Sequence, residues 1–253
     1  MRTLRAVLIA LLSAFLTASA VYFLVVRPKV KGWGVDPAEA ELPIPGDELI
    51  GQPSHVETRG ITIEASPTAV WPWLVQMGHE RAGWYSYDAM DSRRPSSDVI
   101  RPELQALAEG DIMPTHPGGG FVIKTVRPEL ALVLYIDTEL VRSQAEQAQA
   151  EGHDEAPMRG SKAGGAMRGA SYPEFAASWA FYLQPLDRGR TRLIERFRAQ
   201  TPGSGPASAV LGEIMGTGIV LMTRKQMLGI KERVERAGQT QPETVAEEEA
   251  APA

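Results

Sequence analysis

The chain has 253 residues, of which 43% are hydrophobic and 23% are charged, a composition typical of a globular protein with a sizeable core. Its formal net charge of −5 argues against a nucleic-acid partner, because binding to phosphates requires a basic surface. The absence of cysteine excludes disulfides, thiolate nucleophiles and cysteine-bound metals. The oligomeric state is left open by the sequence.

An uncharged apolar run occupies residues 6–26. At about 1.5 Å per residue it covers the ~30 Å hydrocarbon core of a bilayer. We therefore expect residues 1–31 to be an N-terminal transmembrane anchor, with the membrane as a partner and a single-pass location in the cell membrane. The alternative is a signal peptide cleaved after residues 18–20. Basic residues flank both ends of the run, so the positive-inside rule does not assign the side of the remaining domain.

A connector rich in glycine and proline follows at residues 32–56. The folded domain is expected to begin near Glu57 and to extend to residue 237. Its first element is a strand at 61–65, where apolar and polar side chains alternate. The acidic tail at 238–253 is poor in apolar residues and is expected to be disordered.

A short helix is expected directly after the first strand. Ser66 suits its N-cap, Pro67 suits its first position, and Gly78 is a natural stop. Pro72 inside this helix removes a backbone hydrogen bond and predicts a kink. A further helical turn is expected within residues 102–111, which end in a Gly-Asp pair.

Four later segments are rich in β-branched and aromatic residues and predict further strands: 121–126, 131–139, 178–186 and 191–200. Residues 140–175 break this pattern and are interpreted as a low-complexity insertion. The last expected element is a long helix at about 206–236. A long helix that covers the apolar face of an antiparallel sheet gives an α+β fold.

Six segments combine into a recognisable pattern: LPIPGDE (42–48), TRGITIEASPTAVWPWLVQMG (58–78), RAGWYSYD (81–88), PELQALAEGD (102–111), SWAFYLQPLDRGRTRLIERFR (178–198) and MLGIKERVE (227–235). This pattern and the order of elements resemble a bacterial subgroup of the SRPBCC or START-like helix-grip superfamily, which includes lipid-transfer domains and polyketide cyclases. The resemblance implies a curved antiparallel sheet wrapped around the C-terminal helix. It also implies a cavity that usually receives an apolar or amphipathic ligand, whereas the chemistry of the family varies.

The aromatic segment GWYSYDAMD at 83–91 is the first candidate site. Trp84, Tyr85 and Tyr87 pair an apolar body with a polar tip, which suits the mouth of a ligand cavity, and Asp88 would hold a polar group. The structural alternative is an aromatic lid packed on the kinked helix, with Asp88 capping the next short helix.

Glu195 is the second candidate, because it shares the strand face of Leu193 and Phe197. A carboxyl that points into a cavity has its pKa raised by desolvation, which suits proton transfer. The alternative places Glu195 at a strand edge, paired with an arginine such as Arg81. The arginines of the opposite face, 192, 196 and 198, are interpreted as a solvated surface.

Three further side chains are candidate ligand contacts: Trp179 on the inward face of its strand, and Met215 and Met222 on the long helix, where flexible thioethers suit an adaptable pocket. The four histidines are scattered, so no metal site and no cofactor are expected. No nucleophile elbow or phosphate loop is present in the sequence.

The main functional expectation is therefore a membrane-tethered domain that binds a small apolar or amphipathic, lipid-like molecule. Without a catalytic motif, an enzyme is the less favoured interpretation. Two alternatives stay open. One is a cyclase- or dehydratase-like enzyme with Glu195 or Asp88 as acid or base. The other is a non-catalytic interaction module whose cavity is filled by its own side chains.

Overall fold

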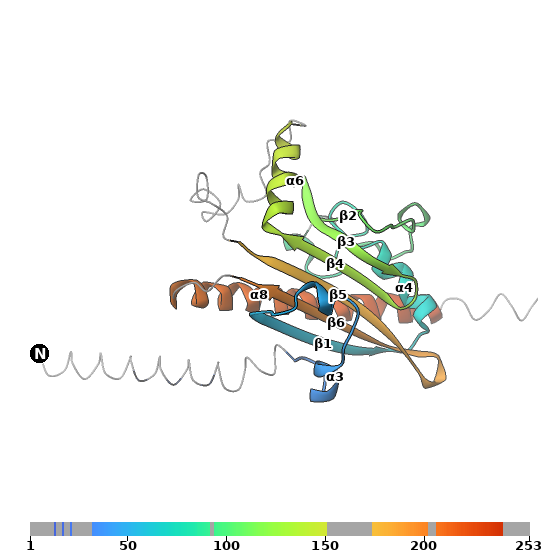
Figure 1. Ribbon diagram of the computed structural model, residues 1–253. Helices are drawn as coiled ribbons and strands as arrows, with labels where there is room; N and C mark the ends of the chain where they lie inside the picture. The colour runs from blue at the N-terminus through green and yellow to red at the C-terminus, as the bar shows by residue number, and fades with distance from the viewer. Residues whose placement is uncertain are drawn as a thin grey trace, which may run out of the picture.

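The computed structural model describes residues 32–91, 94–150, 174–201 and 206–239, together with Ser13, Thr17 and Val21. Side chains are described for all of these except 90–91 and 206–219. The described parts form one antiparallel sheet with a long helix across one face and shorter helices around its edges (Figure 1).

The sheet has six strands in the order β1-β6-β5-β4-β3-β2, all antiparallel to their neighbours. Their bounds are β1 His55–Ile63, β2 Ile112–His116, β3 Gly119–Arg127, β4 Ala131–Asp137, β5 Ala176–Leu186 and β6 Arg190–Gln200. Five of the six overlap predicted strands, although β1 was expected only at 61–65 and begins six residues earlier. The strand that was not predicted is β2, because its residues precede a glycine run that resembles a flexible turn.

The long C-terminal helix, α8 (Pro206–Gln239), lies across the sheet (Figure 1). Its described buried apolar side chains include Met227, Ile230 and Val234, which recur at helical spacing and join the main core. The predicted α+β arrangement of an antiparallel sheet and a long C-terminal helix is therefore present.

The expected fold class included a transmembrane helix, and this part of the prediction is wrong for the described residues. In the part of the chain that the structure describes, no helix is long and apolar enough to cross a membrane. The run at 6–26, on which the expectation was based, lies outside the described residues apart from three single positions.

Helix α4 (Pro67–Val75) begins as predicted, with the Ser66 hydroxyl accepting from the backbone N–H of Ala69. Pro72 lies inside the helix, and the buried side chains of Trp73 and Leu74 face the main core. Between α4 and β2, the described helical segments are short. They are α5 (Asp88–Asp91) and one turn, η3 (Pro102–Leu104), so the helical turn predicted within 102–111 ends earlier than expected.

The predicted connector forms the cover of the second sheet face. It contains α3 (Pro37–Glu41) and η2 (Asp47–Leu49), and a small core on this face joins Ile44 to Val133 and Ile194. The arginine face of β6 is therefore not solvated, which corrects the sequence interpretation.

Arg196 is the clearest case of this correction, being 3% exposed. Its guanidinium donates to the Asp47 carboxylate at 2.6 Å and to the backbone oxygen of Leu42 at 2.8 Å. Arg192 pairs with Glu39 at 2.7 Å, and Arg198 pairs with Asp47 at 3.3 Å. Alternation along β6 placed these side chains on the outer face, but it carried no information on the chain that covers them.

Part of the predicted insertion is regular. Residues Thr138–Ala150 form α6, which packs against β3 and β4, while residues 151–173 lie outside the described residues. Gln144 of α6 both donates to and accepts from the backbone of Gly120 in β3. The residues beyond 239 in the predicted tail likewise lie outside the described part of the chain.

Candidate functional site

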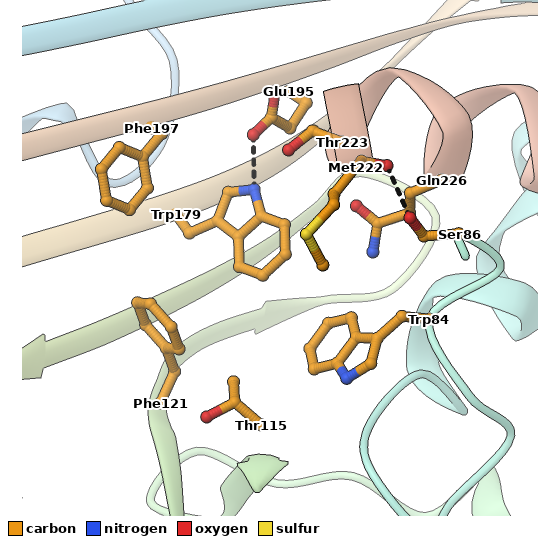
Figure 2. A pocket seen from close by; sticks show the side chains of 10 residues that line it. All are labelled: Trp84, Ser86, Thr115, Phe121, Trp179, Glu195, Phe197, Met222, Thr223 and Gln226. Atoms are coloured by element: carbon orange, nitrogen blue, oxygen red, sulfur yellow. Dashed lines mark hydrogen bonds between the residues drawn. The ribbon is translucent and has the colours of Figure 1, made fainter. Parts of the chain in front are cut away.

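A cavity of about 430 Å³ lies between the sheet and α8 (Figure 2). Its lining residues come from five elements that are far apart in the sequence and from the loop that follows α4. They are Trp84 and Ser86 of the loop, Thr115 of β2, Phe121 of β3, Trp179 of β5, Glu195 and Phe197 of β6, and Met222, Thr223 and Gln226 of α8.

Four aromatic side chains line the cavity. Trp84 and Trp179 are stacked with ring centroids 5.5 Å apart, and Phe121 packs against Trp179 at 5.8 Å. Trp179 lies directly opposite Phe197 in the β5–β6 pair, so neighbouring strands present two aromatic side chains to the same space. The wall therefore offers a large apolar surface made of rigid rings.

Glu195 is the charged residue of this wall, and both of its oxygens are engaged. Oε1 accepts from the indole Nε1 of Trp179 at 2.5 Å, and Oε2 accepts from Arg59 Nη1 at 2.7 Å. Burial raises the pKa of the Glu195 carboxyl above its ordinary value, while the charge and hydrogen bonds of Arg59 and Trp179 oppose that rise. Glu195 lies on the inward face, as its spacing predicted, and its arginine partner is Arg59 of β1.

Arg81, the arginine named as a possible partner, has another role. Its guanidinium donates to the backbone oxygens of Met77, Val75 and Leu104, which ties the end of α4 to the following loop. Burial lowers the pKa of the Arg81 side chain.

A chain of ionic contacts leads from the cavity wall to the surface. Arg59 contacts both Glu195 and Glu57, and Glu57 Oε1 lies 2.8 Å from Nε2 of His55. Arg59 and Glu57 are almost completely buried, whereas the His55 side chain is 28% exposed. The Trp179 indole is thus held in place by a network that is anchored on β1.

The aromatic segment at 83–91 divides between the cavity and the core. Trp84 and Ser86 line the cavity, whereas Tyr85 is 1% exposed and packs edge-on against Trp73 of α4. The Tyr85 hydroxyl accepts from Gln76 Nε2 at 2.8 Å, and burial raises its pKa to about 12. Tyr85 is therefore placed as a core residue of the lid rather than as a cavity residue.

Tyr87 and Asp88 do not line the cavity either. Tyr87 is 46% exposed. Asp88 Oδ1 accepts from the backbone N–H of Ser96 at 3.0 Å and from its hydroxyl at 2.6 Å, which closes the loop between them. Asp88 thus has a local structural partner in Ser96, whereas its expected role as the cap of the next short helix is not seen in these contacts, since Asp88 is itself the first residue of α5.

Two methionines of α8 were predicted to contact the ligand, and the structure tests one of them. Met222 lines the cavity, but the side chain of Met215 lies outside the described residues. The lining residues that were not predicted from the sequence are Ser86, Thr115, Phe121, Phe197, Thr223 and Gln226. Phe197 was recognisable because it shares the strand face of Glu195, and Gln226 because it lies one helical turn after Met222.

Among the described residues, no group of three or more His, Asp or Glu side chains lies close enough together to hold a metal ion. The cavity wall offers aromatic rings, a thioether, hydroxyls, one amide and one carboxylate. Such a set is suited to enclosing an apolar body and contacting one polar group.

No family model matches the chain, and no curated protein matches it. The chain is similar to a conserved protein from Geobacillus kaustophilus at 12% identity and a TM-score of 0.35, covering 72% of this chain and 97% of that one. It is similar to a protein from Mesorhizobium loti at 13% identity and a TM-score of 0.36, covering 72% and 98%. A third similar structure, an uncharacterized protein from Rhizobium leguminosarum, has 12% identity, a TM-score of 0.31 and coverage of 72% and 96%. Similarities this low carry no argument about function, and the resemblance to the helix-grip superfamily stays a prediction.

Proposed function

We propose that the protein binds a small apolar or amphipathic, lipid-like molecule in the cavity between the sheet and α8. The observation that carries the proposal is a space of about 430 Å³ whose lining includes four aromatic side chains and Met222. Small-molecule sites in proteins are typically concave, mostly apolar and roughly 300–1,000 Å³ in volume. The predicted resemblance to proteins with a cavity between sheet and helix supports the same proposal.

The energetics favour an apolar guest. Each Å² of apolar surface removed from water contributes about 25 cal/mol, and stacked indoles offer wide, rigid faces for such contact. Met222 adds an unbranched thioether that adapts its shape to different guests. An apolar molecule therefore gains free energy by moving from water into this space.

Acid–base catalysis receives less support from the geometry. A catalytic carboxyl needs an oxygen that faces the reacting proton, and both oxygens of Glu195 already accept from Arg59 and Trp179. Asp88, the other candidate, accepts twice from Ser96 and does not line the cavity. We therefore favour ligand binding over a cyclase- or dehydratase-like activity.

A direct test is native mass spectrometry of the purified full-length chain, followed by solvent extraction of any bound molecule. Under the proposal, an apolar compound copurifies, and fluorescent fatty-acid or sterol probes are taken up by protein that has been stripped of it. Protein that is repeatedly empty and takes up none of the probes would overturn the proposal.

A pair of variants links uptake to this cavity. Thr115→Trp places an indole in the space from β2, and we expect it to abolish probe uptake. Ile112→Trp adds the same ring to the same strand at a residue that is 44% exposed and does not line the cavity. This control should take up the probe as the unsubstituted protein does. Equal uptake by both variants would place the binding elsewhere.

A further inference from the structure

Gln226 brings an unpaired acceptor to the cavity wall. Its side chain reaches from α8 toward the space beside Met222 (Figure 2), and the residue is 2% exposed. Within the described parts of the chain, its Oε1 atom has no hydrogen-bond partner. Buried polar atoms are almost always paired in folded proteins, because an unpaired one forfeits its interaction with water. The amide oxygen of Gln226 is therefore free to accept a hydrogen bond from a donor on a ligand.

The other atom of the same amide shows which way the group is oriented. Nε2 lies 3.5 Å from Sδ of Met77, and a thioether sulfur is a weak acceptor that has no proton to donate. This contact favours the nitrogen on the sulfur side and leaves the oxygen unpaired. The last torsion of a glutamine side chain is broad, so a small rotation presents Oε1 to a molecule in the cavity.

Glu195 supplies an independent observation. Among the described residues that line the cavity, it is the only one with an ionisable side chain. Its counter-charge, Arg59, is fully buried and does not line the cavity. An anionic head group in this space would meet the carboxylate without a cation on the wall, and like charges repel each other more strongly than in bulk water when they lie against low-dielectric protein.

From these two observations we infer that the ligand is an apolar molecule whose polar end is an uncharged hydrogen-bond donor, a hydroxyl group, held by Oε1 of Gln226. The inference rests on the proposed function and names the head-group chemistry of its ligand. A hydroxyl supplies the donor that Gln226 lacks and adds no charge beside Glu195. A carboxylate or phosphate supplies only acceptors and a second negative charge.

Three ligands of nearly equal size separate these head groups: decanol, methyl nonyl ether and decanoate. They are titrated into the full-length chain at pH 8, and binding is followed by tryptophan fluorescence because Trp84 and Trp179 line the cavity. We expect decanol to bind about three- to tenfold more tightly than the ether, which is the effect of one hydrogen bond. Decanoate should bind most weakly.

Two variants assign the selectivity to residues. Gln226→Met keeps the length of the side chain but removes the acceptor, so it should erase the difference in affinity between decanol and the ether. Gln184→Met, at a half-buried glutamine of β5 outside the cavity, should retain the difference. Glu195→Gln removes the negative charge and should narrow the gap between decanoate and the ether. Circular dichroism confirms that each variant is folded.

The outcomes distinguish the two proposals. If none of the three ligands binds and the fluorescent probes are not taken up, the proposed function itself fails. If the ligands bind, but the ether equals decanol or decanoate is the tightest, the proposed function stands and the inferred head group is wrong. If folded Gln226→Met keeps the full preference for decanol, Gln226 is not the acceptor and the inference is overturned.

Discussion

Arg59 Nη1 donates to Glu195 Oε2 at 2.7 Å across the β1–β6 pair, and neither side chain has more than 1% of its surface exposed. The two residues face each other in the strand register. Their pairing is what allows a carboxylate to lie in the cavity wall, because a buried charge is tolerated when it is paired and hydrogen-bonded. The same pair fixes the oxygen that receives the Trp179 indole.

Removing one partner of this pair is expected to destabilise the fold. Arg59→Met leaves two buried carboxylates, Glu57 and Glu195, without their shared cation. Breaking a buried pair in this way typically costs about 3–5 kcal/mol. Glu195→Gln should cost less, because its amide oxygen still accepts from Arg59 or Trp179. Urea unfolding monitored by tryptophan fluorescence measures both changes. An Arg59→Met protein as stable as the unsubstituted chain would contradict this account of the wall.

A second prediction concerns the packing of α8 against the aromatic segment at 83–91. A Cβ atom added at Gly229 would lie 2.2 Å from the backbone oxygen of Tyr85, a distance that backbone atoms cannot accommodate without moving. Alanine is about 1 kcal/mol better than glycine inside a helix, but overpacking typically costs about 1–3 kcal/mol. We therefore expect Gly229→Ala to lower the midpoint of thermal unfolding and to displace the aromatic segment at 83–91.

Gly238 provides the matched control for this prediction. It lies on the same helix, and an added Cβ would meet nothing within 4 Å. Gly238→Ala should leave the thermal midpoint unchanged or raise it slightly, because only the helix propensity changes. If both alanine variants behave alike in calorimetry, the close approach of α8 to Tyr85 does not limit the packing.

The direction of Glu195 was predictable from sequence, because alternation along a strand has a period of two residues. Its neighbours Leu193 and Phe197 had already assigned the face. The identity of its partner was not predictable, since Arg59 lies 136 residues earlier and the strand register is a tertiary property. The same limit explains the error on Arg196. Its side chain points away from the cavity, as predicted, but residues of the connector cover it and exclude it from solvent.

The aromatic segment shows a second limit. Its residues lie in a loop where Gly83 has a φ of +82° and Tyr85 a φ of +57°, values that belong to neither a strand nor a right-handed helix. Neither strand nor helix periodicity therefore applies to this segment. Composition alone marked the segment as aromatic, but it could not separate the cavity residue Trp84 from the core residue Tyr85 and the exposed Tyr87.

A third prediction is the acid sensitivity of the connector. The hydrogen bond from Arg192 holds the pKa of Glu39 below its ordinary value, opposed by the desolvation of the carboxylate. A lowered pKa contributes stability that is present above the ordinary value of about 4.3 and is lost as the pH falls through the folded value. We expect hydrogen exchange at 36–50, corrected for its intrinsic rate, to accelerate below that pH. Glu39→Gln should exchange faster already at neutral pH and show a smaller acid response. An acid response identical to that of the unsubstituted chain would contradict the assignment.

The fourth prediction tests the attachment of α6 to the sheet. Gln144 accepts from the backbone N–H of Gly120 at 3.0 Å and donates to its oxygen at 3.1 Å. Gln144→Ala removes both bonds while improving helix propensity, so any loss of protection reflects docking and not helicity. We expect faster hydrogen exchange and earlier proteolytic cleavage within Thr138–Ala150. Gln149→Ala, an exposed position of the same helix, should change neither. Equal protection in the two variants would mean that α6 is held by its apolar contacts alone.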